Sequence, residues 1–142
     1  MNYLAGSIKA QGAFYVPAGD AKVSHIDARD IARVAVKTLT TPGHEGRAYD
    51  LSGPQSLSYA EAAEILSRVL GKKVTYVAVT DDAAKAGMIA GGIPEFYADY
   101  LIDLNQAYRK GAGATVTSTV KDVTGREPVA FEQFVKEHAS AF

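Results

Sequence analysis

Hydrophobic and polar positions along the chain follow helical and strand periods in turn. The clearest helical pattern runs from Ser58 to Leu70. Ser58 and Glu61 have the spacing of a capping box, and Gly71 suits the left-handed position after a helix. The apolar residues of this segment share one face at helical spacing: Ala62, Ile65, Leu66, Val69 and Leu70. We therefore predict a helix here, ended by Gly71.

A second helix is predicted immediately after Asp27. Asp27 is a good N-cap residue, and Asp30 lies in the first turn, where the helix dipole favours a negative charge. Apolar residues follow at helical spacing: Ile31, Val34, Ala35 and Leu39. The run Thr40-Thr41-Pro42-Gly43 ends this helix.

The remaining segments indicate an α/β fold. Further helices are predicted over residues 2–11, 80–90, 94–109 and 131–138, and residues 120–124 form at most one helical turn. Short strands are predicted over residues 14–16, 22–26, 47–51 and 73–79, while 112–119 is a loop or short strand. Strand and helix patterns that alternate in this way are typical of α/β proteins.

Composition and charge exclude several classes of protein. The chain has 142 residues, of which 47% are hydrophobic and 22% are charged, so wholesale disorder is excluded. Fifteen basic and sixteen acidic residues leave a net charge of -1, which gives no electrostatic basis for binding nucleic acid or an anionic membrane. The chain has no cysteine, so disulfides, thiolate metal sites and a cysteine nucleophile are excluded.

The sequence pattern predicts neither a signal peptide nor a membrane span. The first residues do not have the order of a signal peptide, because Lys9 follows the apolar positions. The most apolar window, residues 83–93, is far shorter than the ~20 residues of a membrane span. We expect a soluble, cytoplasmic protein that contacts neither membrane nor nucleic acid.

Motif searches give few candidates for chemistry. Neither G-x-G-x-x-G nor G-x-x-G-x-x-G occurs, and Gly111-Ala112-Gly113 is interpreted as a flexible loop. G-x-S-x-G is absent as well, so a stand-alone hydrolase or isomerase has little support. Histidine and carboxylate spacing predicts no metal site. No catalytic residue is assigned.

Two features remain as candidates for ligand binding. His25 ends a predicted strand just before a helix cap, and pockets of α/β proteins open at strand ends. The alternative for His25 is a structural hydrogen bond to the backbone. The second feature is a wide apolar face on helix 94–109, formed by Phe96, Tyr97, Tyr100 and Tyr108. It is either core or subunit interface, or the wall of a pocket whose tyrosine hydroxyls orient a ligand.

Several motifs resemble the NmrA-like group of atypical short-chain dehydrogenases in order and spacing. The resemblance covers nearly the whole chain. The matching segments are Gly12-Ala13-Phe14-Tyr15, Pro17-Ala18-Gly19-Asp20, residues 25–32, Tyr49-Asp50-Leu51-Ser52-Gly53-Pro54, residues 57–61, residues 71–76, Gly92-Ile93-Pro94-Glu95 and residues 123–128.

The resemblance implies which part of such a protein this is. Members of the group carry an N-terminal Rossmann half with the glycine motif, and this chain resembles the part that follows it. Residues 1–142 are therefore expected to be a single C-terminal, substrate-side domain. The implied architecture is a truncated Rossmann-like fold with few short strands and about five helices. The cofactor, NADP or NAD, would be bound by the missing half and by no residue of this chain.

The resemblance also implies a function. The chain is expected to be the substrate-side portion of an NAD(P)H-dependent reductase of quinone or carbonyl type, inactive without a cofactor-binding half. The alternative is a non-catalytic regulatory module that binds a ligand or a partner. A small apolar or quinone-like ligand is expected to contact Asn2, Tyr3, Phe14, Tyr15, His25 and Tyr97. Cut sheet edges favour a homodimer or docking to a Rossmann subunit.

Overall fold

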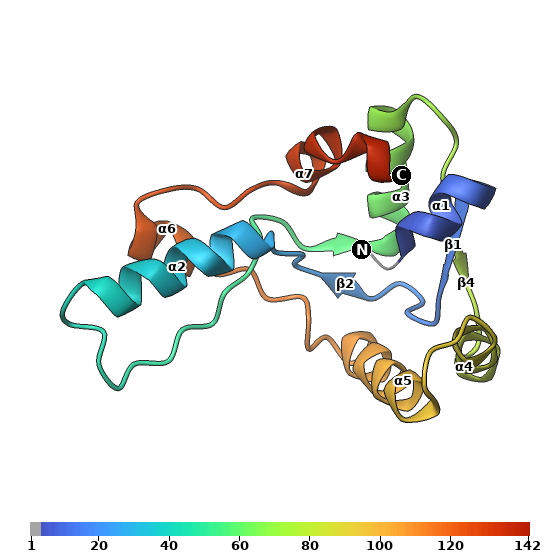
Figure 1. Cartoon of the computed structure of the whole chain (residues 1–142), viewed down its shortest axis with the longest axis horizontal. Coiled ribbons are helices and arrows are strands. Elements are labelled where there is room, and N and C mark those ends of the chain that lie inside the picture. Colours follow the sequence, from blue (N-terminus) through green and yellow to red (C-terminus); the bar gives the residue numbers. More distant parts are fainter. Residues whose placement is uncertain (1–3) are drawn as a thin grey trace.

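The computed structural model describes residues 4–142 (Figure 1). Its elements follow one another as α1 (Ala5–Gln11), β1 (Ala13–Val16), β2 (Lys22–Val23), α2 (Ala28–Thr40), β3 (Leu57–Ser58), α3 (Tyr59–Leu70), β4 (Thr75–Ala78), α4 (Asp81–Ala90), α5 (Glu95–Arg109), α6 (Thr119–Thr124) and α7 (Phe131–Glu137), with a final 3-10 turn at Ala139–Ala141. The α/β class is confirmed. Residues 4–142 contain seven α-helices, more than the about five that the resemblance implies. α1 lies within the segment 2–11 that is predicted to be helical, and α6 is the segment that is expected to form at most one helical turn.

Two small sheets organise the fold. β1 and β4 pair in parallel, in a register that sets Ala13 beside Thr75 and Val16 beside Ala78. β2 and β3 pair antiparallel over two residues each. Within residues 4–142, β1 and β4 pair with no third strand.

The hydrophobic core lies where α1, α3 and α7 pack around the β1–β4 sheet. Ile8 of α1, Phe14 of β1, Leu66 of α3 and Val135 of α7 are fully buried. Each of these helices buries a single apolar face, as their hydrophobic periodicity requires. The core therefore fixes the sheet from several sides.

The predicted caps of α3 are confirmed. The Ser58 hydroxyl accepts from the Glu61 amide at 3.1 Å, and the Glu61 carboxylate accepts from the Ser58 amide at 2.7 Å. Gly71 ends the helix at φ 65°. This reciprocal cap satisfies two amides that the helix itself leaves without partners.

A buried carboxylate fastens α2 to the C-terminal region. Asp30, predicted in the first turn of α2, is fully buried and accepts from the Val129 amide at 2.8 Å. It also pairs with Arg33, one helical turn further on. A buried charge with both a cation and an amide donor is compensated, so this contact holds residues 128–130 against α2.

Two predicted strands were wrong in whole or in part. Residues 47–51 form no strand, and of residues 22–26 only Lys22–Val23 pair in a sheet. Isolated backbone bonds remain here, since the Ser24 amide donates to the Gly113 carbonyl at 2.8 Å. Side chains supply further bonds: the Ser24 hydroxyl donates to the Thr115 carbonyl at 2.8 Å, and the Ser52 hydroxyl accepts from the Thr117 amide at 2.8 Å. Serine and threonine compete in this way with regular backbone pairing.

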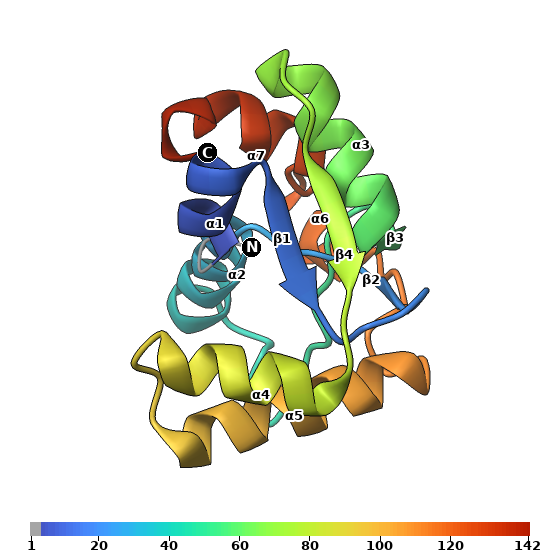
Figure 2. The same cartoon turned by 90° about the vertical axis from the view of Figure 1, so that its right-hand side faces the viewer.

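Helices α4 and α5 form an antiparallel hairpin across the ends of the parallel strands. In Figure 2 the arrowheads of β1 and β4 both point toward this hairpin, which crosses below them. The hairpin therefore covers the carboxyl end of the sheet. No helix within residues 4–142 is long and apolar enough to cross a membrane.

Candidate functional site

A hollow of about 700 Å³ lies at the carboxyl ends of β1 and β4. It is lined by Pro17, Gly19, Ala78, Val79, Thr80, Asp81, Asp82 and Arg109. Ligands of open α/β sheets bind outside the carboxyl ends of the strands. The hollow at this end of the sheet is therefore a candidate binding site.

An ion pair forms one wall of this hollow. Both Arg109 terminal nitrogens donate to the Asp81 carboxylate, each at 2.8 Å, and the Arg109 guanidinium also donates to the Pro17 carbonyl. Gln106 donates to the same carboxylate at 3.1 Å. The Arg109 hydrogen bonds lower the pKa of the Asp81 carboxyl. The wall thus joins the base of the α4–α5 hairpin to the end of β1.

Tyr76 supports the loop beside this hollow. Its hydroxyl lies 3.1 Å from both the Val16 and the Gly19 carbonyl oxygens. Burial raises the pKa of the Tyr76 hydroxyl, so it stays protonated and able to donate. The sequence analysis missed both Tyr76 and Arg109, because their partners are 57 and 28 residues away and no local motif links them.

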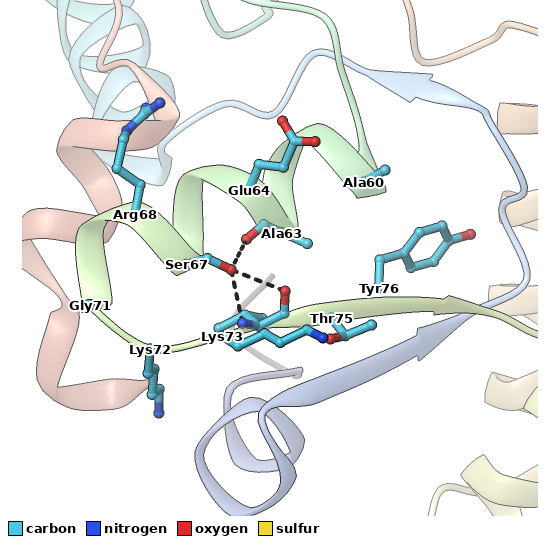
Figure 3. Close-up of a pocket in the computed structure, with 11 residues that line it drawn as sticks. Ala60, Ala63, Glu64, Ser67, Arg68, Gly71, Lys72, Lys73, Thr75 and Tyr76 are labelled. Atoms are coloured by element: carbon cyan, nitrogen blue, oxygen red, sulfur yellow. Dashed lines mark hydrogen bonds between the residues drawn. The ribbon is translucent and has the colours of Figure 1, made fainter.

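A second hollow, of about 690 Å³, lies between α3 and β4 (Figure 3). Its floor contains Ser67, whose hydroxyl accepts from the Val74 amide at 2.8 Å and so ties the start of β4 to α3. Its cations are partly engaged: Arg68 pairs with Glu132, and Lys72 donates to the Phe142 carbonyl. This hollow is at the amino end of β4, the end at which α/β sheets do not usually bind ligands.

The predicted site residues fall into separate places. Asn2 and Tyr3 lie outside the described residues. Phe14 is fully buried, with its ring 5.6 Å from that of Tyr76, so it belongs to the core. Tyr15 points to the other side of β1, where it is 46% exposed and its hydroxyl donates to Gln11.

His25 is enclosed by aromatic rings. Its ring centroid is 5.9 Å from that of Tyr59 and 5.7 Å from that of Phe131. Its Nε2 atom is buried and has no hydrogen-bond partner within residues 4–142, so the expected structural hydrogen bond is not found at this nitrogen. Burial lowers the pKa of His25 to about 4, and the imidazole is neutral at pH 7.

Tyr97 lies in a different aromatic group, on α5. Its ring is 47% exposed and stacks on Tyr100 at a centroid distance of 6.0 Å. The structure therefore joins Phe14 and His25 through the ring of Tyr59, and it leaves Tyr97 outside that cluster.

The residues at the carboxyl end of β4 do not fit a dinucleotide phosphate. The helix that follows β4 begins with Asp81 and Asp82. A pyrophosphate is bound at a helix N-terminus by free amides and positive potential, and two carboxylates in the first turn oppose it. No nucleotide-dependent step is therefore assigned to this helix. In the described part of the chain, no group of three or more histidine or carboxylate side chains is placed to hold a metal ion.

Comparison with known proteins gives a consistent family. The model of the NmrA-like family matches residues 5–134. An NAD(P)H azoreductase of Xenophilus azovorans is 49% identical over 97% of this chain, and the match covers 48% of the azoreductase. The chain spans about half the length of the curated relatives it matches.

Solved structures agree in fold. An NADPH-dependent quinone oxidoreductase of Escherichia coli superposes with a TM-score of 0.89 at 26% identity, over 96% of this chain and 50% of that one. A Citrobacter triphenylmethane reductase complexed with NADP(H) superposes with a TM-score of 0.84 at 29% identity, over 96% of this chain and 47% of the reductase.

Proposed function

The chain belongs to the NmrA-like family, and we propose that residues 1–142 are the substrate-side unit of an NAD(P)H-dependent reductase that acts on a quinone or carbonyl compound. In this proposal the nucleotide is bound by a half that lies outside these residues. The observation that carries it is the match to the azoreductase, which takes in 97% of this chain but only 48% of that enzyme.

The open sheet supports the need for a further half. In the described residues β1 and β4 pair only with each other, so each strand has one unpaired edge. An unpaired strand edge is a template for pairing with another segment. We propose that a Rossmann half docks beside β1, either as another part of the same polypeptide or as a separate subunit, or that two copies pair as a homodimer.

The proposed substrate contacts differ in accessibility. Tyr15 and Tyr97 offer exposed rings and are the contacts that a ligand reaches directly. Phe14 lies in the core and His25 is half-buried beside Tyr59, and we propose that both support the wall of the substrate pocket from behind. Asn2 and Tyr3 complete the proposed set.

Nucleotide binding tests the proposal most directly. The purified chain is titrated with NADPH while the nucleotide fluorescence is followed, and no saturable binding is expected. The same chain joined to the part of the 49% identical azoreductase that it does not match should bind NADPH and reduce a quinone.

Two outcomes would count against the proposal. Saturable NADPH binding by the chain alone would show that these residues build a cofactor site themselves. A joined protein that binds NADPH and quinone without turnover would favour the alternative, a regulatory module that binds ligands without reaction.

A further inference from the structure

The turn of the α4–α5 hairpin carries a concentration of exposed apolar side chains. Phe96 and Tyr100 of α5 are 77% and 56% exposed, and Tyr97 lies between them. Ile89, at the end of α4, is also exposed. We call Phe96, Tyr97 and Tyr100 the aromatic shelf. Three large rings grouped at one end of a helix are unusual on a surface that only meets water.

The rings of the shelf are arranged for stacking. Tyr97 and Tyr100 are inclined by only 19°, with ring centroids 6.0 Å apart. Phe96 meets Tyr97 with an edge, at 63° and 6.5 Å. Two nearly parallel rings present π-faces of similar orientation, and offset stacking with a third flat ring is a favourable geometry for such faces.

The shelf is not needed to hold the hairpin together. α5 buries a different face, formed by Ala98, Ile102 and Asn105. Its contact with α4 near the turn is ionic, since Lys85 pairs with Glu95 at 3.0 Å and with Asp99 at 2.6 Å. At the other end of the hairpin the Asp81–Arg109 pair closes the contact. The aromatic rings are therefore available to a ligand.

The hydroxyls of the shelf are available as well. Neither the Tyr97 nor the Tyr100 hydroxyl has a hydrogen-bond partner within residues 4–142, whereas the Tyr15 hydroxyl donates to Gln11. A quinone is a flat conjugated ring that carries two carbonyl acceptors. The shelf thus offers both a stacking surface and donors for such a ligand.

The hairpin places the shelf on the β1 side of the sheet. In Figure 2 the turn between α4 and α5 lies on the left, on the side of β1 and α1, and not on the side of β4. In the described part of the chain β1 and β4 pair only with each other, so β1 has an unpaired edge on this side and β4 has one on the opposite side. A half that docks beside β1 would extend the carboxyl end of the sheet toward the shelf.

We propose that the aromatic shelf is the surface on which the conjugated ring of the substrate stacks, with a Tyr97 or Tyr100 hydroxyl donating to its carbonyl oxygen. This inference rests on the proposed function, because it names the surface that receives the quinone. The other possible occupant, a second copy of the chain, is an outcome of the test.

Direct binding tests the shelf without any turnover. Menadione, a naphthoquinone, is equilibrated with the chain in dialysis, and the absence of cysteine excludes its capture by a thiol. Tyr97→Leu/Tyr100→Leu keeps apolar bulk but removes both rings, and it should weaken binding at least tenfold. The control Leu39→Ser changes an 85% exposed apolar residue on α2 and should leave binding unchanged. Phe96→Leu should weaken binding less, because it removes the edge-on ring.

The proposal is overturned if the double variant binds menadione as tightly as the wild type, or if Leu39→Ser loses as much menadione affinity as the double variant. If the double variant does not fold by circular dichroism, the single variants Tyr97→Leu and Tyr100→Leu carry the same comparison. Sedimentation gives the third outcome: a dimer that dissociates in the double variant, together with no menadione binding, would assign the shelf to contact between copies.

The azoreductase-joined protein separates this inference from the proposed function. A raised KM for menadione in the double variant, with NADPH affinity unchanged, supports both. If the double variant turns over menadione with an unchanged KM, the role of the shelf is overturned but the proposed reductase function is not. Menadione binding that depends on the shelf, without turnover in any joined protein, overturns the function and leaves the shelf standing.

Discussion

The carboxylate of Asp81 and the guanidinium of Arg109 form a two-point ion pair, with both nitrogen–oxygen distances at 2.8 Å. Asp81 opens α4 and Arg109 closes α5, so this pair joins the two ends of the helical hairpin. Arg109 also donates to the carbonyl of Pro17, directly after β1. The hairpin that carries the aromatic shelf is thus fastened to the carboxyl end of the sheet at its base.

Arg109→Met should loosen the hairpin locally. The pair is partly exposed, at 36% and 31%, and exposed pairs contribute little to global stability. We therefore expect a small change in the melting temperature but faster amide hydrogen exchange over residues 81–109. Lys110→Met is the matched control, since no side-chain partner of Lys110 is found in the described structure. Equal exchange in the two variants would contradict a fastening role.

His25→Phe should remove an acid-induced loss of stability. The folded pKa of about 4 lies below the ordinary 6.5, so the unfolded chain binds the proton first. The stability that neutral His25 contributes is present above pH 6.5 and is lost as the pH falls from 6.5 toward 4, by at most about 3 kcal/mol.

Urea unfolding of wild type and His25→Phe at pH 7 and pH 5 measures this loss. The wild type should lose more stability than the variant over this interval, because phenylalanine keeps the ring contacts and binds no proton. Carboxylates titrate in both proteins and cancel in the difference. An equal fall in the free energy of unfolding in both proteins between pH 7 and pH 5 would show that protonation of His25 does not destabilise the folded chain.

Gly53→Ala should be severely destabilising. A Cβ on Gly53 would lie 1.7 Å from the His25 carbonyl oxygen, which is a backbone atom and not the movable end of a side chain. The contrasting variant is Gly87→Ala in α4, where a Cβ meets no atom within 4 Å. That change should stabilise the chain by up to ~1 kcal/mol, since alanine is the better helix former. Thermal unfolding of the two variants should therefore shift in opposite directions.

Ser58→Ala should cost about 1 kcal/mol through the cap of α3, which is a loss of roughly 4 °C in melting temperature for a domain of this size. The control is Ser118→Ala, at the N-cap of α6. The Ser118 hydroxyl bonds to the exposed Asp122 carboxylate and not to a helix amide. If both variants lose a similar amount of melting temperature, the loss in Ser58→Ala is not due to the capping box.

Local patterns determined much of the fold. The capping box at Ser58, the N-cap at Asp27 and the left-handed Gly71 act between residues close in sequence, so periodicity and cap residues predicted α2 and α3 correctly. Segment 47–51 has a strand pattern but forms no strand. Ser52, directly after this segment, instead forms hydrogen bonds with Thr117, which is 65 residues further along the chain.

The sequence by itself determined the α/β class, the main helices and the family resemblance, because each rests on nearby residues or on the order of short motifs. Only the tertiary structure decided which side chains meet. It placed Phe14 in the core and sealed Nε2 of His25 among aromatic rings. It also brought Arg109 to Asp81 at the carboxyl end of the sheet. These contacts join distant segments, and chain folding, not local propensity, fixes their geometry.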